Sequence, residues 1–275
     1  MHKRPFLQTI VFLLTILFAL SAQAGNSSLM MATTTSTDGT GLLDYLKPHF
    51  EKETNVELKW TATGTGKAMK LGQNCDVDVL LVHAPPAEKK YIENGYGKDR
   101  VEIMYNDFVI VGPKSDPAGI KGKGVSEALT AIKDKQAVFM SRGDDSGTNK
   151  KEKLLWKTAG IDLPEKEKWY VQTGQGMGTT ITMTQERQGY TMTDRGSFIK
   201  YLSSQGEKAS LDVVVEGDQI LLNQYSVLTL DPKNCPNADY ELALKFADWM
   251  ASPSTQKLIK DFRLLGKTLF VPNAR

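Results

Sequence analysis

Four short segments of the sequence combine threonine or serine with glycine, a mixture that can bind an anion. They are residues 33–41 (TTTSTDGTG), 62–67 (ATGTGK), 141–148 (SRGDDSGT) and 173–180 (TGQGMGTT). Each follows a predicted strand and precedes a predicted helix, where backbone N–H groups face the positive end of the helix dipole and glycine permits close approach. One such loop alone is typical of a helix cap or turn. Their repetition predicts an oxyanion site.

Arg142 is the candidate charge partner for such an anion. Arg142 and Lys67 are the basic residues of the four segments. A guanidinium group can bind an oxyanion through two parallel hydrogen bonds, which makes Arg142 the better candidate. The alternative is a surface ion pair between Arg142 and Asp144 or Asp145, which is a common and weak interaction.

The sequence offers little material for catalysis. Beyond the N-terminal segment the histidines are His49 and His83, both isolated, which disfavours a histidine triad or a histidine metal site. Asp144 and Asp145 could form an acid–base pair, but capping and turn roles are commoner for adjacent aspartates. We therefore expect no enzyme, no cofactor and no bound metal cation.

Two partial motif matches also fail. The segment that ends in Gly66-Lys67 resembles a phosphate-binding loop, but Thr61 and Ala68 stand where that motif requires glycine and serine or threonine. Ser146 is followed by glycine, yet Asp144 stands where a nucleophile elbow requires glycine. Neither match supports catalysis.

The elements that would position these loops alternate between strand and helix. Short runs rich in valine, isoleucine and phenylalanine alternate with segments of helical period, which is typical of βα units around a mostly parallel sheet. The predicted strands are residues 29–32, 56–61, 77–82, 103–111, 137–140, 169–171, 190–193, 213–215 and 224–230. The fold class is therefore α/β.

Two extended segments, residues 103–111 and 219–230, are longer than a typical strand and could cross between two lobes. With one crossing near Gly112 and the return near Gly217, the chain divides into three segments. Residues 25–111 and 218–275 would form the first lobe, and residues 112–217 the second. Each lobe would contribute two of the four loops, and clefts between lobes are where ligands usually bind.

The N-terminus has the pattern of a cleavable secretory signal over residues 1–24. Lys3 and Arg4 precede an apolar run over residues 9–20, and Ala22-Gln23-Ala24 stands immediately before Gly25. The run is shorter than the roughly 20 apolar residues that an uncleaved anchor needs. Removing Lys3 and Arg4 from the 34 basic residues leaves 32, equal to the 32 acidic residues. We therefore expect an exported protein whose mature chain has no net charge. Such a chain has no overall electrostatic attraction for nucleic acid or membrane.

Cys75 and Cys235 are the two cysteines of the chain. An even number in an exported protein favours one disulfide. Two buried free thiols are the alternative, because pairing geometry cannot be derived from sequence. Both cysteines would fall in the first lobe, as pairing requires.

The order of these motifs resembles that of the periplasmic tungstate-binding proteins of ABC importers. The matching stretches are ATTTSTDGTGLLDYLKPHFEKET, ATGTGKAMKLG, DVDVLLVHAPPAE, NDFVIVGP, SRGDDSGT, GQGMGTT, YTMTDRG and the segment from VEGD to ILLNQYSV, nearly the whole mature chain. The resemblance implies a type II periplasmic binding fold, in which each lobe is a mixed sheet flanked by helices, with two crossover strands at the hinge. It also implies lobe closure on the oxyanion, delivery to a membrane permease and ATPase, and a monomer.

Carried over by position, the resemblance implies which residues bind the anion. In the first lobe these are Thr34, Thr35, Ser36 and Thr65. In the second lobe they are Arg142, Ser146 and Thr148, with contributions from Gly176, Met177, Gly178 and Thr179. Tyr190 and Thr191 are weaker candidates from the strand behind. Which of residues 33–37 face inward stays open, because side chains alternate along an extended segment.

The identity of the anion rests mainly on the resemblance. Tungstate and molybdate are dianions near neutral pH and suit a site made of donors alone; the sequence does not separate these two anions. Phosphate keeps a proton and needs an acceptor, which Asp144 or Asp145 could supply, so phosphate binding is the alternative. In a tungstate site these carboxylates must point away from the dianion and orient Arg142 or cap the following helix. A peptide-binding module is disfavoured because the loops lack aromatic anchors.

Overall fold

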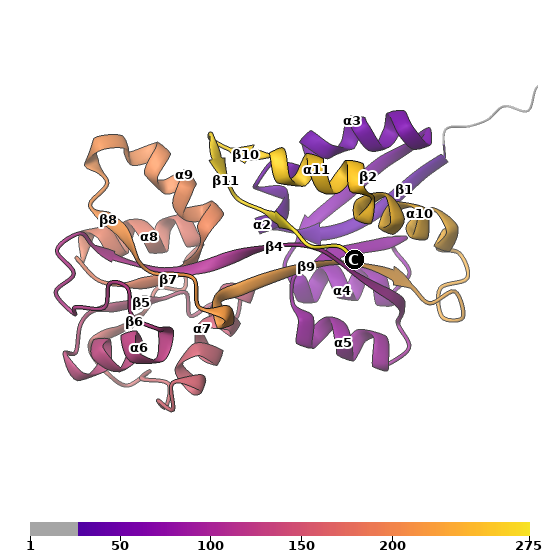
Figure 1. The fold of residues 1–275 in the computed structure, drawn as a ribbon. Helices are drawn as coiled ribbons and strands as arrows, with labels where there is room; N and C mark the ends of the chain where they lie inside the picture. Colours follow the sequence, from indigo (N-terminus) through magenta and orange to yellow (C-terminus); the bar gives the residue numbers. More distant parts are fainter. Residues whose placement is uncertain (1–26) are drawn as a thin grey trace, which may run out of the picture.

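Strand β4 (Gly97–Pro113) runs through both halves of the molecule and organises the fold. The computed structural model describes residues 27–275, and the predicted signal peptide, residues 1–24, lies outside the described residues. Figure 1 shows two lobes of helices and strands, with β4 and β9 (Leu222–Leu230) running between them. The predicted α/β class and the two lobes are confirmed.

The remaining elements divide between the two lobes. The first lobe contains β1 (Ser27–Thr34), α2 (Thr35–Asp38), α3 (Leu42–Thr54), β2 (Val56–Thr63), α4 (Thr65–Gln73), β3 (Val79–Val82), α5 (Pro85–Glu93), α10 (Tyr240–Ala251), α11 (Pro253–Asp261), β10 (Arg263–Leu264), β11 (Lys267–Thr268) and β12 (Val271–Pro272). The second lobe contains α6 (Val125–Asp134), β5 (Phe139–Ser141), α7 (Gly147–Thr158), β6 (Tyr170–Gln172), α8 (Met177–Glu186), β7 (Thr191–Asp194), α9 (Arg195–Gln205), η1 (Gly206–Lys208), β8 (Leu211–Val215) and η2 (Gln219–Leu221). None of the helices within residues 27–275 is long and apolar enough to cross a membrane.

The pairing of β4 explains how one strand serves both lobes. The main sheet has the order β12-β4-β9-β3-β1-β2, in which β1 is parallel to β2 and β3 whereas β9 is antiparallel to β3 and β4. Up to Asp107, β4 pairs with β9. From Phe108 onward it pairs with β7 and β8. The sheets of both lobes therefore share one strand of 17 residues.

The core of the first lobe draws on both ends of the chain. Leu29 and Met31 of β1 are fully buried. They belong to the same cluster as Phe50 of α3 and Phe246 of α10. The Phe50 ring packs edge-on against Phe246 and Trp249, with centroid distances of 5.3 and 5.2 Å. Residues from the two ends of the sequence are therefore held together by one apolar interior.

The core of the second lobe comes from one continuous stretch of chain. Trp156 of α7 is fully buried and packs edge-on against Phe139 of β5, with 5.2 Å between the ring centroids. The two clusters of buried residues that form this core all lie between Phe108 and Leu221. This lobe therefore needs no residue from either end of the chain to complete its clusters.

The two long strands differ from their predicted limits. Residues 219–221 form the turn η2 because the Asp218 side chain accepts a hydrogen bond from the Ile220 N–H group (3.3 Å), so β9 begins at Leu222. β4 is longer than predicted because its antiparallel ladder with β9 extends back to Gly97. The residue limits predicted for the two lobes stay a prediction.

A disulfide joins Cys75 and Cys235, which confirms the predicted pairing. Cys75 follows the C-terminal end of α4, and Cys235 lies between β9 and α10. Their Cα atoms are 5.4 Å apart, although 160 positions separate them in the sequence. The bond therefore ties the early strands of the first lobe to its late helices.

Candidate oxyanion-binding site

The four glycine-rich loops all lie between the end of a strand and the start of a helix. In the first lobe, β1 leads into α2 and β2 into α4. In the second lobe, β5 leads to α7 and β6 to α8. The first N–H groups of a helix have no partner within that helix. The loops therefore have the donor arrangement that the sequence predicted.

Strand pairing brings the loops of each lobe together. Thr34 at the end of β1 lies in register with Thr63 at the end of the parallel strand β2. In the second lobe, Ser141 of β5 lies opposite Gln172 of the parallel strand β6. Adjacent parallel strands end at the same edge of a sheet, so the two loops of each lobe are neighbours.

One distance and one hydrogen bond place the loops of one lobe near the other lobe. A Cβ atom added to Gly147, the first residue of α7, would lie 4.0 Å from Thr65 Oγ1 at the start of α4. The Lys200 ammonium group of α9 donates a hydrogen bond to the Gly39 carbonyl oxygen after α2. The first residues of α4 and α7 therefore lie close together where the lobes meet.

The first loop exposes Thr35 and Ser36, whereas Thr34 is buried. Thr34 caps α2, because its Oγ1 accepts a hydrogen bond from the Thr37 N–H group at 3.1 Å. Thr34 Oγ1 also lies 3.0 Å from Ser36 Oγ and 2.7 Å from Thr37 Oγ1. The hydroxyl group of Thr34 is therefore shared among protein partners, while Thr35 and Ser36 can reach a ligand.

His83 belongs to this loop in space, which the sequence interpretation missed. Its Nε2 lies 3.0 Å from Thr34 Oγ1 and 3.1 Å from Ser36 Oγ, and its Nδ1 lies 3.0 Å from Asn223 Oδ1. Burial lowers the pKa of His83. Its position in the sequence could have identified it, because His83 directly follows a predicted strand, as the first loop does.

The Arg142 guanidinium group is oriented by Asp144. Arg142 Nε donates to Asp144 Oδ2 at 3.1 Å, and Nη2 donates to the same oxygen. Asp144 Oδ1 accepts a hydrogen bond from the Ser146 N–H group at 3.2 Å. Although burial opposes the change, hydrogen bonds from Ser146 and Arg142 lower the pKa of Asp144. The ion pair with Asp144, which the sequence offered as the alternative to anion binding, is present and fixes the direction of the guanidinium group.

Asp145 is held by a different partner. Its carboxylate pairs with the Lys150 ammonium group at 3.2 Å, and both side chains are exposed. The Asp145 N–H group donates to Asn149 Oδ1 at 3.2 Å, and the backbone is left-handed, with φ of 57°. Asp145 therefore shapes the turn before α7 while its charge faces Lys150.

A buried carboxylate supports the Arg142 loop from behind. Glu152 of α7 accepts hydrogen bonds from Ser141 Oγ (2.6 Å), the Tyr170 hydroxyl group (2.6 Å) and Trp156 Nε1 (3.1 Å). Because Ser141 immediately precedes Arg142, this network anchors the start of the loop. A buried network whose members are paired gives a site rigidity.

The other predicted residues of the second lobe lie in the first turns of α7 and α8. Ser146 caps α7 by accepting a hydrogen bond from the Asn149 N–H group at 3.3 Å, and Thr148 is partly exposed. At α8, Gly178 and Thr179 are exposed in the first turn.

Gly176 and Met177 complete the start of α8. Gly176 is its N-cap residue and is exposed. The Met177 side chain belongs to the buried cluster that includes Ile181 and Phe198. Its contribution to an anion site is therefore limited to its backbone N–H group.

Tyr190 and Thr191, the weaker candidates, lie in the interior of the second lobe. The Tyr190 hydroxyl group donates to Asp116 Oδ1 and accepts from the Ala118 N–H group, both at 2.8 Å. The Thr191 hydroxyl group donates to the Met140 carbonyl oxygen at 2.6 Å. Both hydroxyl groups are engaged inside the lobe, and the role of these two residues as anion ligands stays a prediction.

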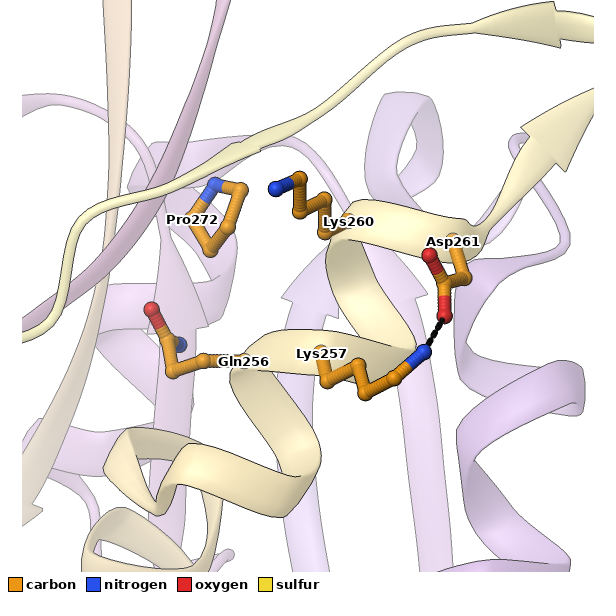
Figure 2. A pocket seen from close by; sticks show the side chains of 5 residues that line it. All are labelled: Gln256, Lys257, Lys260, Asp261 and Pro272. Carbon is orange, nitrogen blue, oxygen red and sulfur yellow. Dashed lines mark hydrogen bonds and ion pairs between the residues drawn. The ribbon is translucent and has the colours of Figure 1, made fainter.

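A pocket of about 390 Å³ lies on the first lobe, away from the four loops. Figure 2 shows its lining residues, Gln256, Lys257, Lys260, Asp261 and Pro272. None of them is a predicted site residue. In the part of the chain that the structure describes, no group of three or more His, Cys, Asp or Glu side chains could hold a metal ion.

Comparisons with known proteins agree with this arrangement. The sequence matches the model of the PBP superfamily domain over residues 21–254. It is 50% identical over 240 residues to the tungstate-binding protein TupA of Campylobacter jejuni, covering 87% of this chain and 89% of that protein. The structure resembles the tungstate-binding protein TupA from Desulfovibrio alaskensis, with a TM-score of 0.88, 60% identity and coverage of 90% of this chain and 100% of that chain. It also resembles the tungstate ABC transporter structure from Geobacter sulfurreducens, with a TM-score of 0.73, 48% identity and coverage of 86% and 98%.

Proposed function

We propose, because this chain belongs to the PBP superfamily and to the family of the tungstate-binding proteins, that it captures tungstate for an ABC importer. It has the two-lobed type II periplasmic binding fold and acts in transport rather than in catalysis. The observation that carries the proposal is the meeting of loop–helix junctions from both lobes, at Thr65 and Gly147, beside an oriented Arg142.

The chemistry of the loops fits a fully ionised tetrahedral anion. We propose that the ligands are Thr35, Ser36, Thr65, Arg142, Ser146, Thr148 and Thr179, with the backbone N–H groups of Gly176, Met177 and Gly178. These groups donate hydrogen bonds to oxygen atoms of the anion. The Asp144 carboxylate serves Arg142, so it can orient the guanidinium group without occupying the anion position.

The setting of the protein follows from the same family membership. We propose that residues 1–24 direct export, that the mature protein is a periplasmic monomer, and that its partner is the permease of the importer. The two lobes would close on tungstate, with molybdate as a second ligand of nearly equal size, and hold it for delivery. No role in nucleic-acid or membrane binding is proposed for a mature chain of balanced charge.

A competitive titration of the mature protein tests this function. Tungstate, molybdate, phosphate and sulfate are each titrated into the protein, and binding is followed by heat and by thermal shift. We expect tungstate to bind more tightly than phosphate, because it offers four acceptor oxygens and no proton to a site of donors. Molybdate and sulfate share these properties, so the expected preference for tungstate over them rests on family membership. Binding of phosphate alone would keep the fold and move the function to phosphate uptake, and failure of all four anions would remove the site assignment.

The Asp145→Asn variant separates tungstate from phosphate binding. The carboxylate faces Lys150, so we expect tungstate affinity to change by less than about 0.5 kcal/mol, the scale of an exposed ion pair. Asparagine tolerates the left-handed backbone found here, so the turn should persist. Calorimetric titration measures both anions, and a collapse of binding in the variant would favour a protonated ligand such as phosphate.

A further inference from the structure

A cluster of polar side chains with His83 at its centre lies directly behind Thr34 and Ser36. One nitrogen, Nε2, lies 3.0 Å from Thr34 Oγ1 and 3.1 Å from Ser36 Oγ. The other, Nδ1, lies 3.0 Å from Asn223 Oδ1, and the ring stacks on Tyr225 with 4.7 Å between centroids. The imidazole ring is therefore held on both edges and on one face.

The hydrogen bonds of Asn223 determine which nitrogen of His83 carries hydrogen. Asn223 Nδ2 donates to Asn106 Oδ1 at 2.8 Å, so Asn223 Oδ1 is the acceptor that faces His83. Asn223 and Asn106 are each 4% exposed, so water does not compete for these groups. Nδ1 therefore carries hydrogen in both charge states of the ring, and Nε2 alone changes between acceptor and donor.

The state of Nε2 determines what the exposed Ser36 hydroxyl group can offer an anion. In neutral His83, Nε2 can accept the Ser36 hydrogen. A hydroxyl group has a single hydrogen, so a hydrogen donated to the ring is lost to the anion. In the cation, Nε2 donates to the Ser36 oxygen atom, and the Ser36 hydrogen is free to point at a ligand.

We propose that His83 is a positioning residue, whose Nε2 draws the Ser36 hydroxyl hydrogen towards the ring in the free protein and releases it towards the oxyanion in the complex. The proton that Nε2 gains comes from solvent, so binding of the dianion takes up a proton. The inference rests on the proposed function. It adds a role for His83 in the site and the uptake of a proton when tungstate binds. The Ser36 hydroxyl group donates a hydrogen bond to an oxygen atom of the anion.

The groups that face His83 fit this change of charge. Burial lowers the pKa of His83, whereas the hydrogen bond with Asn223 and the charge of Asp194 raise it. Asp194 caps α9 in the second lobe, so its carboxylate favours the cation from across the lobe contact. Tyr225 stays neutral, because burial raises its pKa. A dianion beside Ser36 would raise the pKa of His83 further, so protonation and binding favour each other.

The pH profile of tungstate affinity tests the inference. The pKa of His83 is lower in the free protein than in the complex, so affinity is greatest at low pH. We expect Kd to rise by up to about tenfold per pH unit as pH increases through the interval between the two pKa values. Titration calorimetry at pH 6 to 9 measures this slope, and binding heats in buffers of different ionisation enthalpy should report uptake of up to about one proton per anion.

Matched variants test whether His83 controls the hydroxyl hydrogen through its charge state or only packs against its neighbours. His83→Gln offers Ser36 a donor that does not titrate, so its Kd should be independent of pH and near the value of the unmodified protein at low pH. His83→Asn keeps a donor for Asn223 but does not reach Ser36. It should bind tungstate about tenfold more weakly than His83→Gln, and its Kd should also be independent of pH. His49→Gln, on α3, is the control and should retain the original profile.

The outcomes distinguish this inference from the proposed function. A flat profile for the unmodified protein, or an unchanged slope in His83→Gln, overturns the positioning role while tungstate binding stands. If the unmodified protein does not bind tungstate at any pH, the proposed function and this inference fail together.

Discussion

Replacement of Arg142 by alanine is expected to weaken tungstate binding by about 2 to 5 kcal/mol, as is typical when one partner of a desolvated charge pair is removed. The Arg142 side chain is 16% exposed and held by Asp144. Its removal would take a cation from the site and leave the Asp144 carboxylate uncompensated near a dianion. Calorimetric titration with tungstate measures the loss.

Two variants control this measurement. Lys150→Ala removes an exposed cation from the same loop and helix, so it should change affinity by less than about 0.5 kcal/mol. Arg142→Lys keeps the charge without the fork of parallel donors, so it should fall between the original protein and the alanine variant. A loss below about 0.5 kcal/mol in Arg142→Ala would show that Arg142 contributes no more than a surface pair.

Replacement of both cysteines by serine, Cys75→Ser with Cys235→Ser, is expected to lower the free energy of unfolding by about 2 to 5 kcal/mol. The bond closes a loop whose ends are 160 positions apart, and cross-links of long loops restrict the unfolded chain most. The midpoint of thermal unfolding should fall by roughly 4 to 20 °C. Circular dichroism of the mature protein measures this change.

Tungstate affinity should be nearly unaffected in the double cysteine variant. Cys75 follows the C-terminal end of α4, whereas Thr65 of the candidate site begins that helix. The original protein treated with a reductant is the matched control, and its midpoint of thermal unfolding should equal that of the variant. An unchanged melting temperature in both samples would show that the core of the first lobe holds the chain ends without the bond.

Local patterns in the sequence predict much of this structure. Each strand, loop and helix junction around Thr35, Thr65, Arg142 and Thr179 involves neighbouring residues, so apolar runs and glycine were sufficient signals. The cysteine pairing was predicted from the even number of cysteines and the expected export of the protein. The limits of β4 and β9 were less accurate, because ladder length depends on a partner far away in the sequence.

The contacts at the site that the sequence did not reveal have one physical cause. His83 appeared isolated because its partners Ser36 and Asn223 lie 47 and 140 positions away. The resemblance gave Tyr190 as a weaker ligand candidate, and the sequence did not show that its hydroxyl group extends to Asp116 inside the lobe. Side-chain direction and long-range contacts are properties of the packed structure, and a single sequence does not encode them in any short pattern.

The two lobes differ in when their parts become available as the chain is synthesised. The second lobe takes its core from the single stretch between Phe108 and Leu221, whereas the first lobe joins Leu29 to Phe270. A chain that emerges N-terminus first completes the second lobe while the first still lacks β9, α10 and Cys235. Until those residues arrive, β3 and β4 lack the strand that lies between them, and the Cys75 thiol lacks its partner.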